Sequence, residues 1–532
     1  MRELGLVGFI AGAVALILYE PHAINGGFLS DGWSQLALYE FAPTSGFWDT
    51  LSYFLDQANL APRPLQAAYL LVLYEVLGNH VGFWLTWQIA TNVLMVLMLF
   101  VLLRRLSIPG FDAGIIATLV LIFPAANSLR FWTPTIQAPM SIMLALLGFV
   151  VALAAFDAMQ RRSRFLLHTL SLFLFVLSVL FYEVTLPILL TSLLLYRLHV
   201  RWREAALRWA ADCAVLIPVV LTVTLGSSTG HQETEAGISA HATTIFDAAR
   251  ALFTTVVLPF GSADWYVVGL IALIPVAAIL VHRRLPQDDP MRAELRRWLM
   301  VIVAGLAVVG LGYAIFVPGT DYYNPMAPGV GNRINAVPSI GWVLIFYACA
   351  ILAASLAFRG LPRARLLSSL GAAIACALIA TGWIRSINDY SDYFTRAYAE
   401  DTRVLAMIHN VIPTPRPNST IWTFGQPVEI VPGVPVFGNT WDMTGSVQLE
   451  FDDPSLTSLV AEQDTTFHCG RHSVIPGGKY ALDGTPDPAW SSPYGHTYFI
   501  NTVTGRSTII STPRQCHQAA QSFTRSPPLP GG

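Results

Sequence analysis

Asp31 is the residue whose type and position best suit catalysis. It lies shortly after the first apolar segment, within Phe28-Leu-Ser-Asp-Gly-Trp-Ser-Gln35. A carboxylate at the rim of a membrane cavity can act as a general base toward an attacking hydroxyl group. The alternative is a helix cap, because Ser30 and Asp31 both suit the start of a short helix over residues 33–41. These residues alone leave both interpretations open.

Three arginines outside the arginine-rich loops are candidates for binding a phosphate group: Arg63, Arg130 and Arg333. Guanidinium groups bind phosphate oxygens through charge-assisted, often bidentate hydrogen bonds. Arg63 is also placed to orient Asp31, and Arg130 to form the wall of a cavity. The alternative for Arg63 and Arg333 is contact with lipid headgroups, which long basic side chains reach from the ends of helices.

Aromatic and acidic side chains near these positions suit a substrate cavity. Trp33 and Trp132 can stack on a sugar ring, although anchoring at the membrane interface is the favoured interpretation of Trp132. Tyr182 and Glu183 follow one another at a predicted helix break. Glu183 can position a substrate or bind a metal, or it can pair with an arginine or cap the next helix.

The composition shows what surrounds these residues. Hydrophobic residues make up 54% of the 532 residues, and charged residues only 12%. A soluble domain carries about twice that charged fraction. A protein this apolar cannot cover its own surface with polar groups, so lipid must be part of its solvent. The net charge of −2 gives no reason to expect a nucleic-acid partner.

Arginine-rich connections alternate along the chain with longer connections that hold Asp, Gly, Pro, Trp and Tyr. By the positive-inside rule, the arginine-rich set faces the cytoplasm. This predicts a cytoplasmic N-terminus, an outer C-terminal tail and about eleven spans, near 4–19, 81–103, 111–127, 134–157, 165–181, 183–199, 206–226, 265–282, 298–317, 338–358 and 366–386. The first span has no cleavage site after it, so we interpret it as a retained helix rather than a signal peptide.

The segments outside these spans are also patterned. In the first outer loop, residues 33–41, 47–55 and 64–77 suit amphipathic helices at the membrane surface. We divide the chain into a transmembrane domain, 1–386, and an extracytoplasmic domain, 387–532. The second domain is predicted to be small and α/β or mostly β, with a helix over 393–411 and strands over 420–424, 428–431, 447–451, 498–503 and 507–511.

Two of the five cysteines, Cys469 and Cys516, lie in the polar tail. Two cysteines in a domain outside the cytoplasm indicate a disulfide, and two free thiols are the alternative.

Three features together are similar to one family. They are Asp31-Gly-Trp33 in the first outer loop, Arg63-Pro64-Leu65 leading into a span that ends at Arg104-Arg105, and a many-span chain with an outer C-terminal domain. In these features the sequence resembles the GT-C superfamily of polytopic glycosyltransferases, which includes protein O-mannosyltransferases and lipid A aminoarabinose transferases. The resemblance covers about the first two hundred residues, and the rest only as architecture.

The resemblance implies an inverting transfer of sugar from a polyprenyl-phosphate donor to a glycan, lipid or protein acceptor. It implies Asp31 as the base, arginines on the lipid phosphate and a place in the bacterial plasma membrane, in contact with membrane lipids. The chain departs from many relatives in one respect. The region Ala125-Ala-Asn-Ser-Leu-Arg-Phe-Trp132 lacks a second carboxylate. The sequence therefore indicates no definite cofactor, and a divalent cation is left as an alternative.

Other residue groups and other functions are alternatives. His231, Glu233 and Glu235 favour a solvated loop over a metal site, and Asp321 with Tyr322 and Tyr323 is ambiguous. A transporter or flippase for lipid-linked sugars is one alternative function, but no internal repeat supports it. An O-antigen-type polymerase or ligase is another, and it would have no need of an early aspartate.

Overall fold

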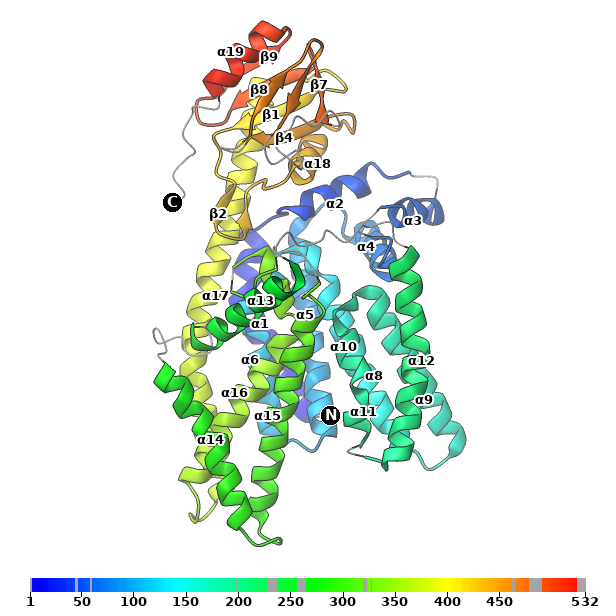
Figure 1. Ribbon diagram of the computed structural model, residues 1–532, viewed down its shortest axis with the longest axis vertical. Coiled ribbons are helices and arrows are strands. Elements are labelled where there is room, and N and C mark those ends of the chain that lie inside the picture. Colours follow the sequence, from blue (N-terminus) through cyan, green and yellow to red (C-terminus); the bar gives the residue numbers. More distant parts are fainter. Residues whose placement is uncertain are drawn as a thin grey trace.

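The computed structural model describes the chain except for residues 1, 44–45, 58–59, 198, 227–236, 256–264, 319–322, 327, 462–464, 478–489 and 524–532. A bundle of long helices forms the larger part of the protein. A small sheet domain stands at one end of the bundle, joined to it by the long helix α17 (Figure 1). The protein is therefore an all-helical membrane part with a smaller α/β part at one end.

Within the described residues, eight helices are long and apolar enough to cross a membrane. They are α1 (Arg2–Asn25), α5 (Val81–Arg105), α8 (Gln137–Asp157), α9 (Arg161–Phe181), α12 (Trp202–Gly226), α15 (Pro290–Ala314), α16 (Pro338–Ala357) and α17 (Ala364–Val411). Helices suit this environment because each satisfies its backbone hydrogen bonds internally. All eight coincide with predicted spans.

Two of the other three predicted spans also fall on helices, one of 12 and one of 20 residues, and the third falls on a broken segment. One is α6 (Gly110–Leu121), and another is α14 (Trp265–Arg284), which follows α13 (Gly237–Thr255). The span predicted over 183–199 is three pieces instead: η3 (Glu183–Thr185), α10 (Leu186–Leu190) and α11 (Ser192–Arg197). Pro187 explains part of this break, because proline lacks the N–H that a continuous helix needs and prefers a first turn.

A second broken segment joins α6 to α8. It consists of η1 (Pro124–Ala126), α7 (Ser128–Phe131) and η2 (Thr133–Thr135), and all of these residues are buried. Polar side chains satisfy its free carbonyls: Gln88 donates to Trp132 O at 2.8 Å and Asn92 to Leu129 O at 2.7 Å. Irregular backbone at this depth is tolerated because protein, not lipid, surrounds it.

The segment between α1 and α5 contains three helices, as predicted. They are α2 (Asp31–Glu40), α3 (Phe47–Leu55) and α4 (Pro64–Leu77). Figure 1 shows α2 running across the end of the bundle, beneath the sheet domain. A short 3-10 segment, η4 (Val330–Asn335), leads into α16 and lies against η1 and α7. The end of the bundle next to the C-terminal domain is thus built from short helices of three separate loops.

Helix α17 crosses the predicted domain boundary at 386/387 without interruption. It is 48 residues long, and its C-terminal half includes the helix predicted over 393–411. At 1.5 Å per residue such a helix is about 70 Å long, more than twice the hydrocarbon thickness of a bilayer. Its last turns therefore stand outside the membrane and carry the C-terminal domain.

The C-terminal domain has a four-stranded sheet in the order β4-β1-β8-β9. Strand β1 (Thr420–Phe424) is parallel to β4 (Thr457–Ala461) and β8 (Thr497–Asn501), and β9 (Arg506–Ile510) is antiparallel to β8. The remaining strands form two small sheets: β2 (Glu429–Val431) with β3 (Val434–Pro435), and β5 (Phe467–Cys469) with β6 (Ser473–Pro476) and β7 (Ser492–Pro493).

The strand predicted over 447–451 is wrong: this segment ends a helix, α18 (Thr440–Phe451). Its alternating apolar residues suit a strand, but the helix starts upstream with a capping box. In that box Asn439 and the side chain of Asp442 satisfy each other's backbone N–H groups. Met443 and Val447 then lie four residues apart on one buried helix face.

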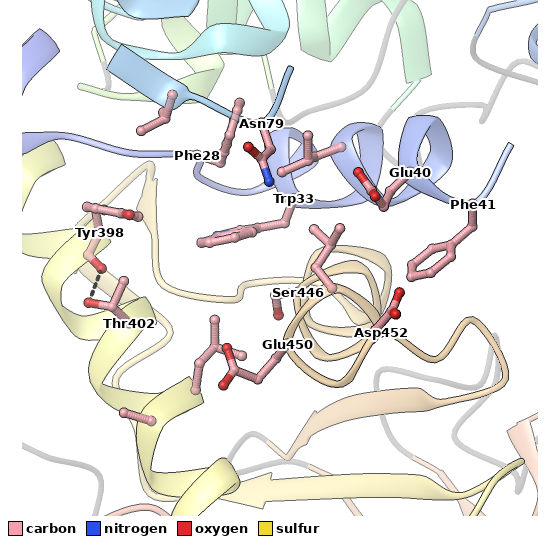
Figure 2. A pocket seen from close by; sticks show the side chains of 15 residues that line it. Phe28, Trp33, Glu40, Phe41, Asn79, Tyr398, Thr402, Ser446, Glu450 and Asp452 are labelled. Atoms are coloured by element: carbon pink, nitrogen blue, oxygen red, sulfur yellow. Dashed lines mark hydrogen bonds between the residues drawn. The ribbon is translucent and has the colours of Figure 1, made fainter. Parts of the chain in front are cut away.

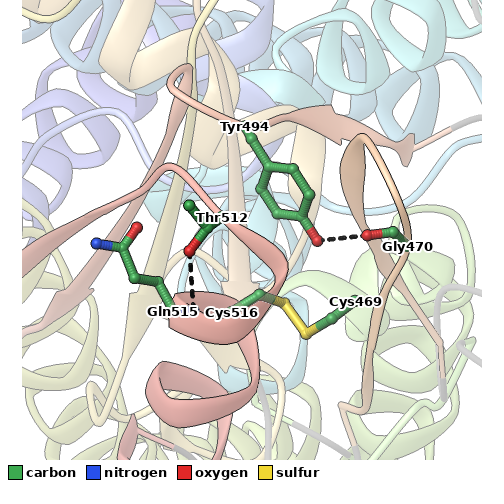
Figure 3. The surroundings of a disulfide bond; sticks show 6 residues. All are labelled: Cys469, Gly470, Tyr494, Thr512, Gln515 and Cys516. Atoms are coloured by element: carbon green, nitrogen blue, oxygen red, sulfur yellow. Dashed lines mark hydrogen bonds between the residues drawn. A yellow bond between two sulfur atoms is a disulfide. The ribbon is translucent and has the colours of Figure 1, made fainter.

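A disulfide joins Cys469 at the end of β5 to Cys516 in α19 (Pro513–Phe523) (Figure 3). It closes a separation of 47 residues. Two hydrogen bonds order the surroundings: Tyr494 OH donates to Gly470 O at 2.7 Å, and Gln515 N donates to Thr512 Oγ1 at 3.2 Å. The cross-link holds α19 on a core that includes Trp422, Phe424 and Phe499.

Candidate functional site

Arg63 and Glu183 form a bidentate ion pair where the loop before α4 meets the break after α9. Arg63 Nη2 lies 2.6 Å from Glu183 Oε1, and Arg63 Nε lies 2.9 Å from Glu183 Oε2. Arg63 stands directly before α4, and Glu183 begins the break after α9, so two irregular points of the backbone meet here. The guanidinium also lies over the ring of Tyr182, 4.7 Å from its centroid.

Arg333 belongs to the same cluster. Its Nη2 donates to the hydroxyl of Tyr323 at 3.2 Å. Its guanidinium carbon lies 5.1 Å from the ring centroid of Tyr323 and 5.4 Å from that of Trp132. Arg333 comes from η4, 270 positions after Arg63 in the chain, so the fold alone brings the two arginines to one place.

The charges of this cluster are coupled. Burial by itself would raise the pKa of Glu183, but Arg63, and after it Arg333, lower the pKa below its ordinary value. Burial likewise opposes the charge on Arg63, whose pKa Glu183 nevertheless raises. The side chains of Arg63 and Glu183 keep 25% and 38% of their surface exposed. Arg63 and Arg333 thus both act on the carboxylate of Glu183, in a cluster that water or a ligand can reach.

Trp132 connects this cluster to the helix that starts with Asp31. Its Nε1 donates to Leu29 O at 3.0 Å, while Arg333 lies over its ring. A side chain added at Gly32 would meet Thr133 Oγ1 at 3.1 Å, so the first turn of α2 rests directly on the same broken segment. Trp132 is only 1% exposed. It is therefore a buried wall residue, neither an interfacial anchor nor an open platform for a sugar.

The carboxylate of Asp31 points toward the C-terminal domain. Its Oδ1 accepts a hydrogen bond from Nε1 of Trp441, the second residue of α18, at 2.8 Å. The N-cap residue of α2 is Ser30, and no side chain caps this helix. Asp31 is half-buried. The contact with Trp441 joins residues 410 positions apart, so no local pattern in the sequence indicates it.

A second carboxyl group lies close to Asp31. Asp442 is fully buried, and its carboxylate accepts the backbone N–H groups of Asn439 and Met443. Burial raises the pKa of Asp442 to about 8 against these hydrogen bonds, and the charge of Asp31 adds to the increase. No sequence signal pointed to Asp442, because its role depends on α18 packing against α2.

Trp33 is held between the two domains. Its Nε1 donates to Oδ2 of the buried Asp401 in α17 at 2.9 Å, and its ring stacks on Tyr398 with centroids 6.3 Å apart. Only 9% of Trp33 is exposed. Asp401 lies in a segment that was predicted to be helical, but no local pattern singles it out.

Arg130 was expected at the donor phosphate, and the structure places it elsewhere. Its Nη1 donates to Phe123 O at 3.1 Å and to Ala126 O, and its Nη2 donates to Val120 O at 2.8 Å. The side chain is 2% exposed. Arg130 therefore satisfies backbone carbonyls of α6 and of the broken segment that follows it, and it is buried there.

Metal-ligating side chains do not gather in the part of the chain that the structure describes. Within it, no group of three or more His, Cys, Asp or Glu side chains is arranged to hold a metal ion. The candidate loop residues His231, Glu233 and Glu235 lie outside the described residues, as do Asp321 and Tyr322. Tyr323 is described and lies in the arginine cluster.

The solved structures that are similar to this chain include the following two. One is the archaeal oligosaccharyltransferase AglB from Archaeoglobus fulgidus, in complex with an inhibitory peptide and a dolichol-phosphate, with 13% identity, a TM-score of 0.42 and coverage of 85% of this chain. This chain spans 64% of that protein's length. The other is ArnT from Cupriavidus metallidurans in the apo state, with 12% identity, a TM-score of 0.37 and coverage of 86% of each chain.

No family model matches the sequence, and no curated protein matches it.

Proposed function

We propose that this chain is a membrane glycosyltransferase of the GT-C type, with a polyprenyl-phosphate sugar as donor. The acceptor is a hydroxyl group of a glycan, lipid or protein on the extracytoplasmic side of a bacterial plasma membrane. One observation carries the proposal. Two arginines from distant loops, Arg63 and Arg333, converge on one partly exposed cluster, and Trp132 links that cluster to the helix of Asp31.

In the proposed reaction, Asp31 takes the proton of the acceptor hydroxyl as its oxygen attacks the anomeric carbon of the sugar. The new glycosidic bond forms as the bond from this carbon to the phosphate oxygen breaks. The bonding pair leaves with the polyprenyl phosphate, and attack from the opposite face inverts the anomeric centre. A phosphate leaving group needs no general acid, only positive charge to stabilise it.

Arg63 and Arg333 supply that positive charge in the proposal. Glu183 occupies two donor groups of Arg63, Nε and Nη2. A lipid phosphate would share these donors or replace the carboxylate, and Arg333 would add a second guanidinium from the other side. The hydroxyl group of Tyr323, which accepts a hydrogen bond from Arg333, is a further donor in this cluster, and the ring of Tyr182 lies against Arg63. This arrangement suits a phosphate monoanion or dianion on a lipid at the outer face.

The test is sugar transfer in membrane vesicles that contain the wild-type chain or Asp31→Asn. The probes are polyprenyl phosphates carrying radiolabelled glucose, mannose or arabinose. Loss of a general base is expected to reduce transfer by about 10²- to 10⁴-fold with normal expression. Asp49→Asn is the matched control, since Asp49 is an exposed acidic residue in the first turn of α3. Equal transfer by wild type and Asp31→Asn would remove Asp31 from the mechanism.

The same vesicles separate the alternatives. A flippase would move the labelled lipid across the bilayer without transferring its sugar, in both proteins. A polymerase or ligase would require a diphosphate-linked glycan and would not depend on Asp31.

A further inference from the structure

A cavity of about 620 Å³ lies at the junction of the membrane part and the C-terminal domain. Its volume is within the range of small-molecule sites, about 300–1,000 Å³. Three helices form it: Trp33, Leu36 and Glu40 lie on one face of α2, Tyr398 and Thr402 belong to α17, and α18 contributes three residues, Ser446, Leu449 and Glu450. In Figure 2 the labelled side chains of the three helices, among them Trp33, Tyr398 and Glu450, surround one space.

The lining combines aromatic rings with acceptor-rich polar groups. The rings are Phe28, Trp33, Phe41 and Tyr398. The carboxylates are Glu40, Glu450 and Asp452, and none of the described lining residues is Lys, Arg or His. Carboxylates only accept hydrogen bonds when ionised, so a ligand must bring its own donors.

This chemistry excludes two kinds of occupant. A lipid phosphate would meet the carboxylates of Glu40 and Asp452 here, and that of Glu450, which pairs with His409 at 3.0 Å, whereas the arginine cluster offers it opposite charges. A lipid chain would bury carboxylate, amide and hydroxyl groups without partners, which is costly. A sugar satisfies both requirements, because its C–H faces stack on aromatic rings while its hydroxyl or ammonium groups donate to carboxylates.

We propose that this junction cavity binds a carbohydrate that is neutral or carries an amino group. On the proposed function, on which this part rests, that carbohydrate is the acceptor glycan. Donor and acceptor would then be sorted by charge, with the anionic lipid at Arg63 and Arg333 and the acceptor beside Glu40, Glu450 and Asp452.

The cavity and Asp31 both lie on the pair of helices α2 and α18. Helices α2 and α18 touch so tightly that a Cβ atom at Gly445 would lie 2.7 Å from Ser34 Cα and 2.8 Å from Trp33 O. The same two helices carry the pair Asp31 and Trp441 on one side of this contact and line the cavity beyond it. A saccharide in the cavity therefore lies against the helix that presents the proposed base.

The test is binding of three tetrasaccharides to the full chain purified in detergent, followed by tryptophan fluorescence. The probes are cellotetraose, which is neutral, tetraglucosamine, which is cationic, and tetragalacturonate, which is anionic. We expect cellotetraose or tetraglucosamine to bind and tetragalacturonate not to bind. Glu40→Gln and Asp452→Asn are expected to weaken binding about tenfold, because each removes a charged acceptor.

Both substitutions are nearly isosteric. A glutamine amide oxygen at position 40 would still accept the hydrogen bond that Tyr74 OH donates to Glu40, and asparagine tolerates the left-handed backbone of Asp452 (φ 51°). Glu75→Gln is the control, since Glu75 is exposed on α4 and does not line the cavity. Binding of tetragalacturonate in preference to the others, binding of none of the probes, or equal loss in Glu75→Gln would each overturn the proposal.

Repeating the titration in Asp31→Asn separates this inference from the proposed function. Saccharide binding that persists while no variant transfers sugar would support the cavity and refute the transferase. Sugar transfer that depends on Asp31, without any saccharide binding, would support the transferase and refute the cavity as a saccharide site.

Discussion

The hydrogen bond from Trp441 to Asp31 allows a specific test of how the proposed base is positioned. Trp441→Phe removes the indole N–H that lies 2.8 Å from Asp31 Oδ1 and keeps an aromatic ring in its place. If the indole orients the carboxylate toward the acceptor, the variant should lower kcat and leave KM for the donor within about twofold, because donor binding depends on other residues.

The magnitude follows from the exposure of the contact. A hydrogen bond to a charged group contributes about 1.5–3 kcal/mol when it is shielded from water. Trp441 is 54% exposed, so water replaces part of the lost bond. About 1 kcal/mol remains, which corresponds to about a fivefold lower kcat. Global stability should change by no more than about 0.5 kcal/mol, as for other exposed substitutions.

The assay is steady-state sugar transfer in vesicles, with Trp490→Phe as the control. Trp490 is another partly exposed tryptophan of the C-terminal domain, 40% exposed. Trp441→Phe should also have no further effect in the Asp31→Asn background, because both changes act through one contact. Equal effects of Trp441→Phe and Trp490→Phe, or independent effects of Trp441→Phe and Asp31→Asn, would refute this reasoning.

Three further predictions concern packing, pH and metal. Gly445→Ala should destabilise the junction of α2 and α18 by about 1–3 kcal/mol, seen as a lower thermal midpoint; Gly310→Ala, where nothing lies within 4 Å, should not. Burial raises the pKa of Asp442 to about 8 from an ordinary 3.8. Between these two values the folded chain keeps a proton that the unfolded chain loses. The contribution of Asp442 to stability therefore falls as pH rises from about 4 to 8. Thermal midpoints across that range should show a smaller slope in Asp442→Asn, and an unchanged slope would contradict the assigned burial. EDTA should change the rate of sugar transfer less than about twofold. Asp442 is the carboxyl group near Asp31, and both of its oxygens already accept backbone N–H groups, so they are not free to bind a metal ion. Loss of transfer that Mg²⁺ or Mn²⁺ restores would show a required cation.

Local patterns predicted the elements of this protein well where one physical signal dominated. Runs of apolar residues identified the eight long helices, because lipid tolerates little else. The short helices α3 and α4 have the predicted bounds. The segment 447–451 was misassigned because its alternation suits a strand, and the deciding capping box lies eight residues upstream at Asn439.

The candidate site was predictable by residue type, less so by role. The sequence pointed to Arg63, Glu183 and Arg333 separately, but it left open whether Glu183 pairs with an arginine. It also placed Arg130 at the phosphate, whereas this guanidinium satisfies backbone carbonyls at the end of α6. Such partners are set by the path of a broken backbone, which no local pattern encodes.

The sequence by itself determined that lipid surrounds this protein, in which order its helices follow and which residue types are available for chemistry. Hydropathy and arginine placement allow this because they act locally along the chain. Only the tertiary structure decided which of those residues meet. Arg63 faces Glu183, Arg333 joins them over Trp132, and Trp441 reaches Asp31 across 410 positions. Contacts this distant in sequence form only when packed helices bring their ends together.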